Sequence, residues 1–209
     1  MQKLKGDIEE RILASAGDEF LRHGYSRASM RGIASAAGVS AGNLYNYFPN
    51  KDELFRRVVA PAITLLEEML RKHHGQKGTD VRDMLSEQYR LRCMREYTAL
   101  VSLHRRPMEI LFFHAEGSSL ENFLDRFTDY ATDLTVDWFR HLDGAHPGTG
   151  PEAMWFTVHL HTVWMFSFLK ELISHDLDEI QTRQALSDYV RFEIEGWKYF
   201  LTDNTVYEH

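Results

Sequence analysis

Apolar residues recur along most of the chain at intervals of three and four positions, the period of an amphipathic helix. In the first twenty residues, one helix face collects Ile8, Ile12, Ala16 and Phe20. Asp7, followed three residues later by Glu10, has the spacing of a capping box and predicts the start of this helix. His23-Gly24 predicts its end. Strand-like alternation of useful length does not occur in the sequence, so we expect an all-α protein of about nine helices.

Two short helices are predicted next. Ser29 has the position of an N-cap for the first of them. Its apolar side carries Ile33, Ala34 and Ala37. Gly38 follows, and the second short helix begins at Ser40 and ends at Pro49.

Longer helices with loop signals between them are predicted for the rest of the chain. Asn50 with Glu53 predicts the start of a fourth helix, in which Pro61 predicts a kink. Pro107 is expected to break a helix that runs from Thr79-Asp80 to about Arg105. Further helices are expected from Ser118 and Glu121 to about Leu142, at 152–175, and at 178–201, where Asp178 and Gln181 have capping spacing.

The two short helices, with the longer one before them, have the layout of a helix-turn-helix. Gly38 suits the turn because the backbone there favours a positive φ. The side chains expected to pack the two helices together are Ile33, Ala34, Val39 and Leu44. Leu44 and Phe48 are four residues apart and should face inward, which leaves the remaining side chains of residues 41–47 on an outward face.

This outward face has the chemistry of a surface that reads DNA. Asparagines at positions 43 and 46 can hydrogen-bond base edges, and the methyl group of Ala41 can touch a thymine methyl. Gly42 has no side chain to hold its backbone away from DNA. Tyrosine hydroxyls and the Lys51 ammonium suit phosphate oxygens. Ser29 and Ser40 lie at helix starts, where free N–H groups favour phosphate.

Roughly the first 60 residues resemble the tetracycline-repressor (TetR) family of bacterial one-component regulators. The resemblance rests on Gly24-Tyr25, Met30–Ala34, the turn Ala37–Ser40, Gly-x-Leu-Tyr-x-Tyr-Phe-x-x-Lys at 42–51, and Asp52–Phe55. It implies a helix-turn-helix DNA-binding domain at residues 1–50 and an effector-binding and dimerisation domain at 51–209. The second domain resembles the family only in length and helical count.

The resemblance also implies roles at matched positions. Ser29 and Lys51 would contact phosphate, and Arg31 would reach a base or a phosphate. The surface facing the groove would consist of Ser40, Ala41, Gly42, Asn43, Tyr45, Asn46 and Tyr47. Position 47 is often histidine in the family, and position 41 is often larger and polar, so the operator sequence stays open. Repression from a palindromic operator, relieved by a small apolar or amphipathic effector, is the commoner family mode; activation is the alternative.

Three other interpretations of the sequence are possible. A plain helical hairpin with a solvated face is disfavoured by the joint spacing of the turn, the aromatic pair and the lysine. An enzyme is disfavoured because no Gly-rich phosphate loop, nucleophile elbow or metal-binding His/Glu spacing occurs in the sequence. A binding protein without DNA affinity is a further alternative. Tyr47→Ala or Lys51→Ala is expected to weaken DNA binding without altering thermal stability; a lost fold instead would favour the plain helical hairpin.

The last two helices carry more apolar residues than one face requires. A helix that is apolar all round must be covered on every side, which favours a homodimer through these helices. The residues predicted for the interface are Trp155, Phe166, Ile173, Tyr189, Phe192, Trp197 and Phe200. The alternative is a thick core within one chain.

An effector pocket is expected among the middle helices, where methionine and aromatic residues suit an adaptable apolar cavity. The predicted lining residues are Met69, Met84, Tyr89, Met108, Phe112, Tyr130, Trp138, Trp164 and Phe168. For each of them an ordinary core position is the alternative. Polar contacts are expected from His104, His114, His159 and His161, whereas His73-His74 is assigned to a loop. No metal site and no cofactor are expected, because His159 and His161 point in different directions.

Charge and cysteine content narrow the cellular compartment that we expect for this protein. The net charge is −7, yet residues 1–60 carry nine Lys/Arg against seven Asp/Glu, so a mildly basic N-terminal part precedes an acidic remainder. Cys93 is the single cysteine, which excludes an internal disulfide and fits a reducing cytoplasm. The sequence shows neither a secretory signal nor a run long enough to span a membrane. We therefore expect a cytoplasmic protein.

Overall fold

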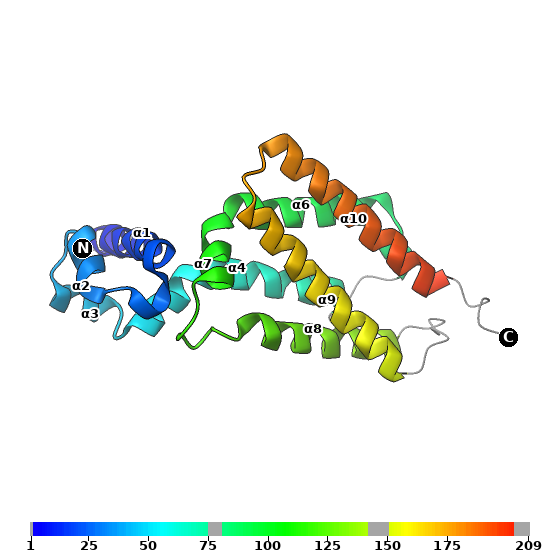
Figure 1. Cartoon of the computed structure of the whole chain (residues 1–209), viewed down its shortest axis with the longest axis horizontal. Coiled ribbons are helices and arrows are strands. Elements are labelled where there is room, and N and C mark those ends of the chain that lie inside the picture. Colours follow the sequence, from blue (N-terminus) through cyan, green and yellow to red (C-terminus); the bar gives the residue numbers. More distant parts are fainter. Residues whose placement is uncertain (1, 75–80, 142–150, 203–209) are drawn as a thin grey trace. The chain divides into compact units, whose positions relative to one another are not determined.

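The computed structural model describes residues 2–74, 81–141 and 151–202, and within these ranges it is all helical, as predicted (Figure 1). The helices are α1 (Gln2–Arg27), α2 (Met30–Ala36), α3 (Ala41–Tyr47), α4 (Lys51–His74), α5 (Val81–Met84), α6 (Glu87–Leu103), α7 (Arg105–Phe113), α8 (Phe123–Arg140), α9 (Pro151–Ser174) and α10 (Glu179–Thr202). The number differs from the expected nine because the helix predicted from Thr79 to Arg105 is divided. The Ser86 hydroxyl donates to the carbonyl of Asp83 and its Oγ accepts from the N–H of Tyr89, at 2.6 and 3.1 Å, which separates α5 from α6.

The chain forms two compact units. The N-terminal unit comprises the residues up to Leu65 together with His104–Phe123, and the C-terminal unit comprises Leu66–Leu103 and the residues from Leu124 onward. The division expected at residue 50 therefore does not coincide with the compact units. Helix α4 contributes its first part to one unit and its last part to the other.

Helix α1 shows where local signals fail. It begins at Gln2, so the predicted start at Asp7 is wrong. Its regular geometry does break at Gly24, where φ is 70° and ψ is 165°, as the His23-Gly24 signal predicted. The predicted inward face is confirmed, since Ile12, Ala16 and Phe20 are all fully buried. The Phe20 ring meets the edge of Phe55 from α4 at 5.0 Å, and this pair anchors the core of the N-terminal unit.

Two further helix boundaries differ from the predictions. Pro107 lies inside the first turn of α7 rather than breaking a helix, because proline is tolerated where no N–H partner is needed. Ser118 and Glu121 serve the turn before α8, where Ser118 Oγ donates to the Ala115 carbonyl and Glu121 accepts from the N–H of Gly117. Helix α8 then begins at Phe123. The predicted end of α8 at Leu142 lies outside the described residues.

Helices α9 and α10 occupy the two long segments predicted at the end of the chain. Asp178 and Gln181 form the expected reciprocal cap: each backbone N–H donates to the other's side chain, at 3.0 and 2.8 Å. Within the C-terminal unit α6 packs against α10 and α9, and Figure 1 shows α9 running beside α8. Phe166 of α9 meets Phe127 of α8 at 5.5 Å, which places the core of this unit between those helices.

Candidate DNA-binding surface and ligand cavity

The turn between α2 and α3 has the geometry expected of a helix-turn-helix. Ser29 caps α2, with its Oγ accepting from the N–H of Gly32 at 3.3 Å. Gly38 has φ 66°, as the turn requires. The guanidinium of Arg11 donates to the carbonyls of Ala37 and Gly38 and holds the turn against α1. Sequence reasoning missed Arg11, because its partners lie 26 and 27 residues away.

Helix α3 presents a polar and aromatic face on an apolar anchor. Ser40 caps it through a bond from the Asn43 N–H at 3.1 Å. Leu44 is fully buried and Phe48 is nearly so, as predicted. The remaining predicted positions are exposed at Ser40, Gly42, Tyr45 and Asn46, and half-buried at Ala41, Asn43 and Tyr47. Among the described residues, no atom lies within 4 Å of where a Cβ of residue 42 would be, so the backbone of Gly42 is open to close approach.

Lys51 has a role that the sequence did not reveal. Its ammonium donates to the carbonyls of Tyr25, Ser26 and Ala28 at 2.7, 3.2 and 3.3 Å, and lies 4.4 Å from the centre of the Tyr25 ring. These three bonds use all the N–H donors of the ammonium. Lys51 therefore fixes the end of α1 next to Ser29, and the expectation that Lys51→Ala leaves thermal stability unaltered does not fit this geometry. Arg31, by contrast, is exposed on α2.

Beside Lys51, Asp52 of α4 and Tyr25 of α1 each make a hydrogen bond to the segment 114–119. Asp52 accepts from the backbone N–H of Ser119 at 2.8 Å. The backbone N–H of Tyr25 donates to the carbonyl of His114 at 2.9 Å. Burial raises the pKa of the Tyr25 hydroxyl, and the carboxylate of Asp52 raises it further. The Tyr25 hydroxyl therefore stays neutral.

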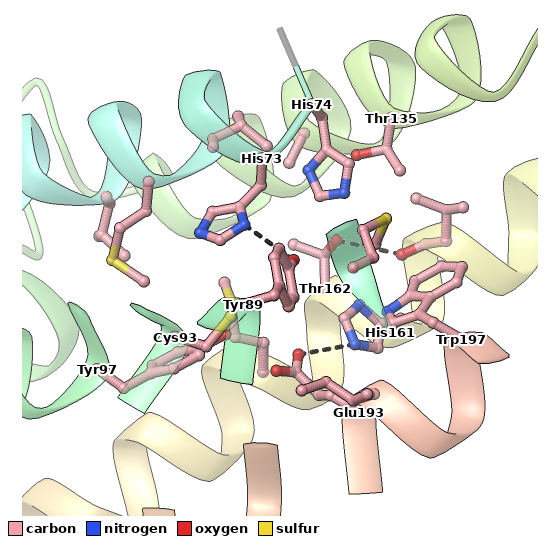
Figure 2. A pocket seen from close by; sticks show the side chains of 18 of the residues that line it. His73, His74, Tyr89, Cys93, Tyr97, Thr135, His161, Thr162, Glu193 and Trp197 are labelled. Carbon is pink, nitrogen blue, oxygen red and sulfur yellow. Dashed lines mark hydrogen bonds and ion pairs between the residues drawn. The ribbon is translucent and has the colours of Figure 1, made fainter. Parts of the chain in front are cut away.

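The C-terminal unit contains a cavity of about 110 Å³ (Figure 2). It is lined by residues from α4, α5, α6, α8, α9 and α10, all within this unit. Three of the nine predicted lining residues, Met69, Met84 and Tyr89, do line it. The lining is mostly apolar, with Leu66, Phe127, Val158 and Met165 among its members.

The other predicted lining residues lie elsewhere. Met108 and Phe112 are buried in α7, within the N-terminal unit, and Tyr130 is half exposed. Trp138 packs against His74 and Phe139, at 5.3 and 5.0 Å. Trp164 faces a surface groove, and the Phe168 ring stacks on Tyr189 at 4.1 Å. Helical period shows which residues are buried, but it cannot show which buried residues border a void.

Polar groups in the cavity wall come from residues that the sequence did not single out. His73 and His74 belong to the last turn of α4, so their assignment to a loop is wrong. His73 contacts the Tyr89 hydroxyl through Nδ1 at 2.8 Å and Glu96 through Nε2 at 2.6 Å. The signal that could have found His73 is the apolar helical period that begins at Leu66 and reaches residue 73.

On the opposite wall, Glu193 of α10 lies between two partners (Figure 2). The Tyr189 hydroxyl donates to it at 2.7 Å. His161 Nε2 lies 2.9 Å from its carboxylate, a charge contact without the alignment of a hydrogen bond. His161 lines the cavity, so its predicted polar contact with an effector stays a prediction, whereas His104 and His114 flank α7 in the N-terminal unit and do not line this cavity.

Burial controls the charge of two other wall residues. It lowers the pKa of His74 to about 3, with His73 and then His161 lowering it further, so the imidazole is neutral at pH 7. Burial also raises the pKa of the Cys93 thiol to about 12, assisted by Glu193. Cys93 is therefore a protonated thiol and a poor nucleophile. Within the described ranges, no group of three His, Cys, Asp or Glu residues is placed to hold a metal ion.

A stripe of exposed apolar side chains runs along the last two helices. It consists of Trp155, Phe156, Leu160, Val163 and Trp164 on α9 and Phe192 on α10. Of the predicted interface residues, only Trp155 and Phe192 belong to this apolar stripe. Phe166, Ile173 and Tyr189 are buried within the chain, and Trp197 lines the cavity. The side chain of Phe200 lies outside those that the structure describes.

Comparison with known proteins shows which proteins are similar to this chain in sequence and in fold. Residues 12–58 match the family of bacterial regulatory proteins named tetR. An uncharacterised HTH-type transcriptional regulator of Haemophilus influenzae is 32% identical over 90 residues, which cover 43% of this chain and 46% of the relative. YhgD of Bacillus subtilis, described in the same words, is 38% identical over 66 residues, which cover 32% of this chain and 33% of YhgD. The chain thus spans less than half the length of the curated relatives it matches.

Solved structures extend the likeness in fold over nearly the whole chain. A TetR-like transcriptional regulator from Rhodococcus superposes with a TM-score of 0.61 at 21% identity, over 90% of this chain and 96% of that one. NalD of Pseudomonas aeruginosa superposes with a TM-score of 0.63 at 19% identity, over 96% and 99%. Across the described ranges, none of the helices combines the length and the apolarity needed to cross a bilayer. Residues 12–58 thus match the tetR family of bacterial regulatory proteins, and the fold over most of the chain is similar to that of TetR-like regulators.

Proposed function

We propose that this protein is a transcriptional regulator that inserts α3 into the major groove of operator DNA. The observation that carries the proposal is the division of α3 into a buried anchor, Leu44, and an outward face of small, amide and phenolic side chains. A seven-residue helix that buries so little apolar surface adds little to the stability of the fold. Its outward face therefore points to a role in binding.

The chemistry of this face suits both sequence reading and positioning. The amides of Asn43 and Asn46 can bond adenine in the major groove, and Ala41 can contact a thymine methyl. The phenols of Tyr45 and Tyr47 suit phosphate oxygens, as does exposed Arg31. The Ser29 and Ser40 hydroxyls already cap their helices, so their contribution to phosphate binding would come through the helix N-termini that they shape.

The exposed stripe on α9 and α10 supports a homodimer. Six large apolar side chains on one surface exceed what scattered exposure explains, and a twofold pairing of such stripes is self-complementary. A dimer would present two copies of α3 to a palindromic operator with half-sites about 34–36 Å apart.

Helix α4 offers a route from ligand to DNA. Its first residue, Lys51, holds the α1–α2 connection, and its last part lines the cavity through Met69, His73 and His74. A ligand that favours one position of this helix would bias the spacing of the two α3 helices. Structures with this fold include the repressors NalD and MexZ, which supports repression as the mode of action; relief by a small effector is supported by the cavity.

The proposal is tested by gel shift with DNA from upstream of the protein's own gene. We expect a specific complex that weakens steeply with salt. Asn46→Ala should weaken it by about 1–3 kcal/mol, the value of one base contact. Asn122→Ala is the matched control, because Asn122 is exposed in the same unit but outside α3. Failure to form a salt-sensitive specific complex there, or at adjacent promoters, would count against a regulator.

A further inference from the structure

The cavity of the C-terminal unit carries chemical information about its ligand, and the inference below rests on the proposed function of that site. The wall combines a largely apolar surface with a few polar groups, whose partners differ. A polar group whose hydrogen-bonding capacity is already used is not available to a ligand, so the unused groups indicate what the ligand must offer.

The acidic groups in and next to the wall are already engaged. Glu96, which does not line the cavity, contacts Nε2 of the lining residue His73 at 2.6 Å. Glu193 accepts from the Tyr189 hydroxyl at 2.7 Å and lies 2.9 Å from His161. A cationic ligand would have to displace one of these partners, and an anionic ligand would lie next to Glu193 without a free counter-charge in the described wall. Either would leave a desolvated charge uncompensated.

Two buried imidazole nitrogens of the wall, Nε2 of His161 and Nδ1 of His74, have no hydrogen-bond partner among the described residues, but only the first lies beside a carboxylate there, that of Glu193 at 2.9 Å. The His74 ring projects from the end of α4 toward the cavity, where Figure 2 shows it between Thr135 and the side chains of α9. A buried imidazole nitrogen without a partner is costly to the folded protein, and a neutral hydroxyl could satisfy it as donor or acceptor.

The size of the cavity limits the ligand further. The volume is about 110 Å³. A dry protein cavity of about 150 Å³ binds benzene, so a molecule of one ring is at the upper size limit for this smaller cavity. The apolar lining, with Leu66, Met69, Val158 and Met165, matches a hydrocarbon body.

We propose that the cavity binds a small uncharged molecule with an apolar body of about one ring and a single hydroxyl group that hydrogen-bonds to Nδ1 of His74. The hydroxyl fills the unused position in the wall. The ring fills the apolar remainder.

Calorimetric titration of the full-length protein with four ring-sized probes tests the proposal. Phenol carries the proposed hydroxyl, benzene lacks it, benzoate is anionic and benzylammonium is cationic. We expect phenol to bind about fivefold more tightly than benzene, the value of one hydrogen bond to a buried group. Both ions should bind more weakly than phenol. Equal or tighter binding of benzene, benzoate or benzylammonium overturns the proposal, and so does an absence of binding by both neutral probes.

The variant His74→Phe keeps a ring of similar size and removes the nitrogen. The ratio of phenol to benzene affinity should fall to about one, while benzene itself still binds. His175→Phe is the matched control, since His175 is exposed at the end of α9 and does not line the cavity; its ratio should equal that of the wild type. A wild-type ratio in His74→Phe contradicts the proposal. Circular dichroism checks that the variant folds, and the four-probe series on the unchanged protein decides the matter if it does not.

Failure of this inference is separable from failure of the proposed function, because the titrations contain no DNA. If the operator complex forms but none of the neutral probes binds, the regulator stands and the ligand class is wrong. If phenol binds as described but no operator complex forms, the ligand class stands and the regulator is wrong.

Discussion

Two charged side chains of this protein, Lys51 and Arg11, bind backbone carbonyls within their own unit, a role that the residue type alone does not predict. Lys51, a surface-type residue in the sequence, spends its three donors on carbonyls at the end of α1. Arg11 does the same for the turn between α2 and α3. Both side chains stabilise backbone that would otherwise leave carbonyls unpaired.

Replacement of Lys51 by alanine should therefore lower stability as well as DNA binding. We expect a loss of about 1–3 kcal/mol in the free energy of unfolding, the usual cost of leaving hydrogen-bonding groups without partners. Urea denaturation followed by circular dichroism measures it. Arg56→Ala is the control, because Arg56 is exposed on the same helix. An unchanged midpoint in Lys51→Ala would show that the carbonyl contacts contribute nothing.

His74 should make stability depend on pH. Its folded-state pKa is about 3 and its ordinary value is 6.5, so the unfolded chain binds a proton between these values that the folded protein does not. Stability is then fully present above pH 6.5 and falls by about 1.4 kcal/mol for each pH unit below it, until about pH 3. Urea midpoints of wild type and His74→Phe at pH 7 and pH 5 measure this, and the variant should lose less. Equal losses in both proteins would remove His74 as the cause.

At the scale of helices, a capping signal in the sequence located the start of a helix when the capping side chain accepts from an N–H of that same helix. Ser29, Ser40 and Asn50 each accept from a backbone N–H three residues on, so spacing alone was enough to place α2, α3 and α4. The same signal misled at Ser118, whose hydroxyl serves a turn before α8. Which helix or turn a capping side chain serves depends on the path of the chain, and this path cannot be deduced from the spacing of residues alone.

Two glycines of the helix-turn-helix should respond in opposite ways to alanine. Gly38→Ala places a Cβ at φ 66° and 3.0 Å from the Arg11 guanidinium, and should cost about 1 kcal/mol or more. Gly42→Ala meets open space inside α3 and should raise stability by about 0.5–1 kcal/mol, while its methyl group obstructs the approach of DNA. Thermal melts and gel shifts on both variants separate the effects. Loss of stability in Gly42→Ala would contradict the proposed surface.

At the scale of the whole molecule, the distribution of apolar surface decides assembly. Helix α9 carries apolar residues around most of its circumference, so its sequence does not say which of them face the core. The fold buries Phe166, Leu169 and Ile173 and leaves Phe156, Leu160 and Val163 exposed. The dimer through α9 and α10 stays a prediction, and the residues that these helices expose differ from most of those predicted for its interface.

Charge introduced on this stripe should prevent dimerisation. Phe192 is 67% exposed beside Trp164, so Phe192→Glu would place a carboxylate against the partner's apolar surface. Ile180→Glu is the matched control, because Ile180 is 81% exposed on the same helix but lies outside the stripe. Light scattering after size-exclusion chromatography should give a monomer for the first variant and a dimer for the second. A dimer in both would move the interface elsewhere.

The sequence by itself determined the helical class, the caps of the short helices, and the anchor and outward face of α3, because each depends on residues within a few positions of one another. Tertiary structure alone decided the roles of Lys51 and Arg11, the separation of cavity residues from core residues, and the exposed stripe. These depend on which helices meet, since a carbonyl partner 26 residues away or a void bordered by six helices has no local period. His74 belongs to the second group: the sequence assigned it to a loop, and its place in the last turn of α4 and its enclosure by several helices appear only in the tertiary structure.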